Sequence, residues 1–200
     1  MHLKKTFLAS SLLLLAGCSS TTPTVESTTT YWIYDIKASQ SLADVETAVK
    51  EAVQTQMTSV SISRNLPPAT VPDQPGKFQM SNALGNSNLG QLLAYNGASI
   101  EMPTCDGAIM IGSSQHNGMA SAGEQSQVNI CLWQYKDGYH LDIISKFTKT
   151  SGGFDARSLA KNLVESVMGD GSQFIPTRVN NIVNKLNAAG MQVSLVEKYP

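Results

Sequence analysis

The residues best able to do chemistry in this sequence are its three cysteines, and the first stands apart from the other two. Cys18 follows an apolar run over residues 7–15 and a basic start with Lys4 and Lys5. A basic start, a short apolar run and small residues before a cleavage site are typical of a secretory signal peptide, here residues 1–17. The apolar run is about half the roughly 20 residues that span a bilayer, so we do not expect a transmembrane anchor.

The four residues Leu15-Ala16-Gly17-Cys18 end this segment. They resemble the lipobox of bacterial lipoproteins, in which the chain is cut before the cysteine and lipid is attached to its sulfur and its new amino group. The resemblance implies that Cys18 is lipidated, since several acyl chains on one residue hold a protein stably at a membrane. In that family an Asp directly after the cysteine tends to retain the protein in the inner membrane, whereas this sequence has Ser19. The resemblance therefore implies an anchor in the outer membrane, on its periplasmic face. The alternative is an ordinary signal peptide whose cleavage site abuts a cysteine.

Cys105 and Cys131 form a natural pair once Cys18 carries lipid, and each lies at or in an expected strand. In an oxidising compartment an even number of cysteines favours a disulfide. A bridge would close a loop of about 27 residues and stabilise the fold by roughly 3–4 kcal/mol. Two alternatives stay open: two buried free thiols, or a redox or metal role, although the Cys-x-x-Cys spacing of redox sites is missing.

Histidines and serines are weaker candidates for chemistry. Only His116 and His140 remain after residues 1–17 are removed, and neither lies in a His-Glu-x-x-His helix or a compact set of zinc ligands. Residues 112–127 bring Ser, His and Glu close in sequence, but a catalytic triad is defined by geometry. We therefore expect no catalytic residues, no metal and no cofactor, and we interpret 112–127 as a hairpin connection.

Aromatic residues predict a binding surface. Trp133 and Tyr135 occupy alternate positions of one expected strand, as Trp32 and Tyr34 do in another. The face that carries Trp133 must be covered, either by the domain's own helices or by a partner that docks on exposed aromatics. Trp133, Tyr135 and His140 are the candidate binding surface.

The charge of the chain argues against one class of partner. Removing residues 1–17, which carry Lys4 and Lys5, leaves 12 of the 14 basic residues against 15 acidic ones. Nucleic-acid binding depends on clustered Lys and Arg that neutralise phosphates. We therefore expect no nucleic-acid partner.

The helices and strands that position these residues are predicted to form one domain, residues 31–200, which follows a flexible tether in the sequence. Residues 18–30 hold Cys18 and a Ser/Thr-rich stretch, which can bury too little apolar surface to become ordered. Residues 65–97 are rich in Pro, Gly and Asn and predict long loops. Long irregular segments in a compact domain are often functional, so these loops are a further place for a binding surface.

The spacing of apolar residues predicts the secondary structure. Strands are expected over 31–37 and 59–63, with a helix between them. Ser41 is the expected cap of this helix, and its apolar stripe consists of Leu42, Val45, Val49 and Val53. Further strands are expected over 98–103, 107–114, 126–135, 139–149 and 191–199, and two late helices over 155–168 and 176–189.

The turn near Gly138 sets the register of the strands on either side. With Asp137 and Gly138 as a two-residue turn, Leu132 faces Ile143 and the apolar side chains share one face. A three-residue loop would pair Leu132 with Asp142 and mix core with solvent, so we prefer the two-residue turn.

The predicted fold is α+β: a mainly antiparallel sheet of about five to seven strands with one early and two late helices packed on it. The expected function is a non-enzymatic binding or accessory module in the periplasm, which takes an envelope protein or a cell-wall component. Two alternatives are a cell-envelope hydrolase acting on peptidoglycan, and a carrier of a small apolar ligand with a closed cavity between sheet and helices.

Overall fold

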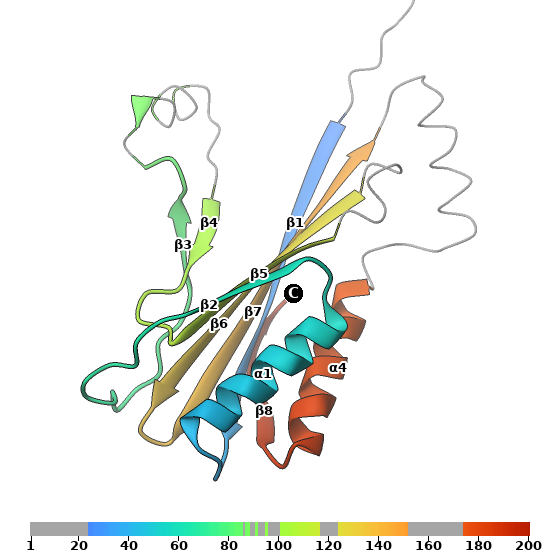
Figure 1. Ribbon diagram of the computed structural model, residues 1–200. Helices are drawn as coiled ribbons and strands as arrows, with labels where there is room; N and C mark the ends of the chain where they lie inside the picture. Colours follow the sequence, from blue (N-terminus) through green and yellow to red (C-terminus); the bar gives the residue numbers. More distant parts are fainter. Residues whose placement is uncertain are drawn as a thin grey trace, which may run out of the picture.

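Apolar residues at alternate positions build an antiparallel sheet in the computed structural model, which describes residues 24–85, 87–88, 91, 95, 101–116, 124–151 and 174–200. The strands of the main sheet are β1 (Thr24–Lys37), β2 (Val60–Arg64), β5 (Met110–His116), β6 (Glu124–Tyr135), β7 (Gly138–Ser151) and β8 (Gln192–Tyr199). They lie in the order β2-β5-β6-β7-β1-β8, and every neighbouring pair is antiparallel. The helices α1 (Leu42–Gln56) and α4 (Phe174–Ala188) lie side by side on one face of this sheet (Figure 1). The predicted α+β class and mainly antiparallel sheet are confirmed.

Strand β1 begins at Thr24, seven residues before the predicted start at Tyr31. Residues 24–30 therefore belong to the sheet and not to the predicted tether, whose residues 18–23 lie outside the described part. The composition of 24–30 is polar, but Thr and Val are β-branched and favour strands. Their partner is the far end of β7, where Thr24 pairs with Ser151 and Thr28 with Phe147.

Helix α1 has the predicted start and stripe. Ser41 is the N-cap, and its side chain accepts a hydrogen bond from the backbone N–H of Asp44 at 3.3 Å. Val45, Val49 and Val53 are buried against the sheet and α4, as an apolar stripe at helical spacing requires. Strands β1 and β2 flank α1 in the sequence, but β5, β6 and β7 separate them in the sheet.

Helix α4 and strand β8 close the chain as predicted. Ile175, Val179, Ile182 and Leu186 form the buried face of α4. Gly190 follows the helix with a positive φ of 83°, which glycine adopts without strain. Strand β8 then pairs with β1, with a bulge between Ile33 and Tyr34. The predicted helix over 155–168 lies outside the described residues.

The predicted register of β6 and β7 is wrong by two residues. Leu132 pairs with Leu141, not Ile143, because the turn residues are Lys136 and Asp137 and Gly138 already belongs to β7. Glycine is required there, since a Cβ at this position would overlap the carbonyl oxygen of Ile36 in β1. A shift of two residues keeps every side chain on its predicted face.

The sheet has two buried faces with different covers. On the helix face, the strand residues Ile36, Ile130, Leu132, Leu141 and Ile143 pack with α1 and α4. The opposite face carries Ile33, Cys131, Trp133 and Ile144, which pack with Phe78, Cys105 and Ala108. Neither of the two predicted covers, helices or a partner, lies over Trp133: its cover comes from the irregular segments on either side of a separate hairpin. That hairpin, which we call the arm, consists of β3 (Gln79–Asn82) and β4 (Glu101–Thr104) and stands beside the main sheet (Figure 1).

Candidate functional site

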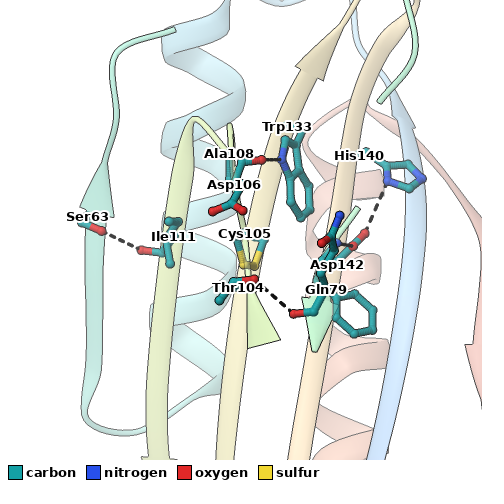
Figure 2. The surroundings of a disulfide bond; sticks show 12 residues. Ser63, Gln79, Thr104, Cys105, Asp106, Ala108, Ile111, Trp133, His140 and Asp142 are labelled. Atoms are coloured by element: carbon teal, nitrogen blue, oxygen red, sulfur yellow. Dashed lines mark hydrogen bonds and ion pairs between the residues drawn. A yellow bond between two sulfur atoms is a disulfide. The ribbon is translucent and has the colours of Figure 1, made fainter. Parts of the chain in front are cut away.

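A pair of cysteines joins the arm to the main sheet. Cys105 directly follows β4, and Cys131 lies in the middle of β6. Their Cα atoms are 5.9 Å apart, within the range of disulfides, and the two sulfur atoms are bonded (Figure 2). Both residues are buried. The bridge therefore fixes one end of the arm to the face of the sheet opposite the helices.

Of the three residues predicted to form a binding surface, two are buried and one is half-buried. Trp133 is only 3% exposed, and its indole Nε1 donates to the backbone oxygen of Asp106 at 2.9 Å. His140, its partner across the β6–β7 ladder, is 7% exposed. Tyr135 is half-buried, and its hydroxyl donates to Asp35 at 2.6 Å. This corrects the prediction: Trp133 and His140 are core residues, because a distant segment covers them.

We call this segment, residues 72–78, the strap. Gly76 lies directly against the indole of Trp133, so closely that a Cβ there would overlap the ring. The backbone oxygen of Gly76 is 3.1 Å from Nδ1 of His140. At the other end, the backbone N–H of Lys136 donates to the oxygen of Pro72 at 2.9 Å. The strap therefore crosses the ends of β6 and β7 and excludes solvent from them.

A buried carboxyl group holds the strap where it leads into the arm. Asp142 is fully buried, and its Oδ2 accepts a hydrogen bond from the backbone N–H of Phe78 at 2.9 Å. Its Oδ1 lies 3.4 Å from Nδ1 of His140 (Figure 2) and accepts no hydrogen bond from the residues that the structure describes. Burial raises the pKa of Asp142 to about 6, although the bond from Phe78 acts in the opposite direction. Burial also lowers the pKa of His140, so both groups favour their neutral forms.

The edge strand β8 adds a second attachment. Glu197 accepts hydrogen bonds from Lys77 of the strap at 2.6 Å and from the hydroxyl of Tyr31 at 2.5 Å. These bonds, Lys77 first, lower the pKa of Glu197. The ring of Tyr31 also meets that of Phe78, with centroids 5.1 Å apart. Both ends of the arm are thus fixed, one by Cys105 and the other by the strap.

Held in this way, the arm forms one wall of a cleft with about 100 Å³ of space. The lining residues from the arm are Met80, Glu101, Met102 and Pro103, and those from the main sheet are Thr29, Gln127, Asn129, Ile144 and Lys146. We call it the arm cleft. The antiparallel register sets its floor: Lys146 of β7 lies between Thr29 of β1 and Gln127 of β6.

The polar side chains of the arm cleft have no partner among the residues that the structure describes. Within the described chain, no side-chain hydrogen bond or ion pair involves Thr29, Gln127, Asn129, Lys146 or Glu101. In the opposite wall, Met80 and Met102 are 42% and 41% exposed. Thioether side chains adapt their shape to what they contact. The arrangement offers a ligand hydrogen-bonding groups on one side and adaptable apolar groups on the other.

The Ser/His/Glu segment does not assemble into a catalytic group among the residues described. His116 contacts the hydroxyl of Thr58 at 3.2 Å and stacks on the ring of Phe174. Glu124 is buried and pairs with Lys149 at 3.6 Å. In the described ranges, no three side chains of metal-ligating type lie together. Cys18 lies outside these ranges.

Sequence reasoning missed the arm cleft, although part of its signal is visible. Gln127 and Asn129 are the polar members of the alternation in β6, on the same side as Cys131. Thr29 falls in the predicted tether and Met80 in the region predicted as loops, whereas the other three arm residues, 101–103, fall in the strand predicted over 98–103. Only the register of three strands brings Thr29, Lys146 and Gln127 into one row.

No protein-family model matches the chain, and a search of curated proteins finds no match. Over the ranges that the structure describes, no helix has the length and apolar character needed to cross a membrane.

Proposed function

We propose that this chain is a lipoprotein of the bacterial cell envelope, anchored through lipid on Cys18 in the outer membrane with its domain on the periplasmic side. The support is the order of parts in residues 1–20: a basic start, a short apolar run and the lipobox Leu15-Ala16-Gly17-Cys18, followed by Ser19. The pairing of Cys105 with Cys131 suits an oxidising compartment such as the periplasm.

The domain acts as a non-enzymatic binding module, and its binding site is the arm cleft. The observation that carries this proposal is the set of polar side chains that line the cleft without partners in the described chain. Half-buried polar groups usually bond to protein or to water. A ligand that satisfies them gains affinity and orientation together. The partner is a component of the envelope, either a protein or the cell wall.

The experiment tests retention of the full-length lipoprotein, extracted in detergent, on two immobilised fractions: purified cell-wall sacculi and solubilised envelope proteins. The blocking variant is Gln127→Trp, because an indole at this half-buried position fills much of a cleft of about 100 Å³. The matched control is Gln125→Trp, which lies two residues along β6 on the same face, is exposed and does not line the cleft.

We expect one of the two fractions to retain the unmodified protein and the Gln125→Trp control, and to release the Gln127→Trp variant. Tryptophan is well tolerated in strands, so both variants should keep the fold, which circular dichroism checks. Failure of both fractions to retain the unmodified protein would contradict the proposal. Equal retention of the two Trp variants would remove the arm cleft as the binding site.

A further inference from the structure

The floor of the arm cleft presents three donors in one row. Lys146 pairs with Thr29 on one side and with Gln127 on the other, across three adjacent strands. Neighbouring strands are about 4.8 Å apart, so the row spans roughly 10 Å. An ammonium flanked by a hydroxyl and an amide is a set of donors that suits a carboxylate. None of the three side chains has a partner in the described chain.

The space beside this row is small and partly apolar. Ile144, two residues before Lys146 on β7, is buried and lines the cleft with an apolar side chain. Met80, Met102 and Pro103 form the opposite wall. About 100 Å³ is well below the roughly 300–1,000 Å³ of a typical small-molecule pocket. The cleft therefore suits a small group that has an apolar part next to its charge.

The two charged residues of the cleft differ in exposure, which orients the ligand. Lys146 is half-buried on the floor, whereas Glu101 is exposed on the arm, and no ion pair joins them. A negative group is therefore favoured at the floor, and a group that carries N–H donors is favoured at the rim. A phosphate dianion fits less well, since the lining has a single cation and an opposing carboxylate.

We infer that the arm cleft binds the free carboxyl end of a short cell-wall peptide whose last residue is as small as alanine. The terminal carboxylate meets Lys146 with Thr29 and Gln127, and the methyl group packs on Ile144 and the arm methionines. The last amide N–H points to the rim, towards Glu101. This inference rests on the proposed function and adds the chemical class of the ligand.

The test measures binding of three probes to the intact lipoprotein in detergent by calorimetry: D-alanyl-D-alanine, its C-terminal amide and L-alanyl-L-alanine. The acid should bind about tenfold more tightly than the amide, because a charge-assisted bond of this kind is worth about one decade in affinity. The variant Lys146→Gln should lose this preference for the acid, and Lys146→Arg should retain it. The control Lys50→Gln removes an equal charge from an exposed position of α1 and should bind like the unmodified protein.

Equal binding of acid and amide would overturn the inference, as would a preference for the acid that survives in Lys146→Gln. Tighter binding of the L-peptide would overturn the cell-wall source and point to a protein chain end. Cleft-dependent retention on an envelope fraction without dipeptide binding would overturn this inference and leave the proposed function standing. Failure of both fractions to retain the unmodified protein is the separate result that removes the proposed function.

Discussion

The buried carboxyl group of Asp142 should make the stability of the domain depend on pH in an unusual direction. Asp142 is fully buried and holds the strap through the N–H of Phe78. Its pKa is about 6 in the folded protein, against 3.8 as the ordinary value. Between these two values the folded state holds more protons than the unfolded chain. The stability due to Asp142 is therefore complete below pH 3.8 and is lost as the pH rises through 6.

The size of the effect follows from the shift. One pKa unit corresponds to 1.36 kcal/mol, so Asp142 contributes about 3 kcal/mol over the whole window and about 1 kcal/mol between pH 7 and pH 5. His140 acts in the opposite direction, because burial lowers its pKa and its protonation below pH 6.5 favours the unfolded chain. Lys77, Glu197 and Asp35 also act on this pair through their charges.

The variant Asp142→Asn separates the two groups. Asn keeps an oxygen that accepts the bond from Phe78, has nearly the same volume and cannot ionise. Relative to the unmodified protein, Asp142→Asn should be more stable at pH 7 than at pH 5 by about 1 kcal/mol. Urea unfolding of both proteins at pH 5, 6 and 7, followed by tryptophan fluorescence, measures this difference. Equal pH dependence in the two proteins would show that Asp142 has no raised pKa in the folded protein.

Three further changes test other parts of the structure. Replacing both Cys105 and Cys131 by Ser should lower the free energy of unfolding by about 3.5 kcal/mol, which is the chain-entropy value for a separation of 26 residues. Urea unfolding of the unmodified protein and of the variant, each with and without reductant, measures this difference. Gly76→Ala should cost about 1–3 kcal/mol and alter the fluorescence of Trp133, because the new Cβ overlaps the indole; an unchanged spectrum and stability would contradict the strap contact. Ser41→Ala should lower the free energy of unfolding by about 1 kcal/mol, because α1 loses its N-cap. Urea unfolding measures this loss, and an unchanged free energy of unfolding would contradict the role of Ser41 as the cap.

Local patterns predicted most of the fold. The cap at Ser41, the apolar stripe of α1 and the alternation in β6 and β7 each depend on residues close in sequence, and each is found where expected. The two-residue error at Gly138 left the side chains on their predicted faces because the period of a strand is two.

Features set by distant residues could not be predicted. The polar residues 24–30 look like a tether until β7 supplies their partner strand. Trp133 and His140 look like an exposed aromatic surface until the strap, more than 50 residues earlier, covers them. The arm cleft depends on the register of three strands and on where Cys105 and Asp142 hold the arm, so the polar alternation of β6 by itself could not locate it.

We propose above all that Cys18 carries lipid and anchors the domain to the envelope. The most direct measurement is labelling of cells that produce the full chain with radioactive palmitate, beside cells that produce a Cys18→Ser variant. We expect the unmodified protein to take up label and to sediment with outer membranes, and Cys18→Ser to take up none. Label retained by Cys18→Ser, or an unlabelled protein free in the periplasm, would contradict this proposal.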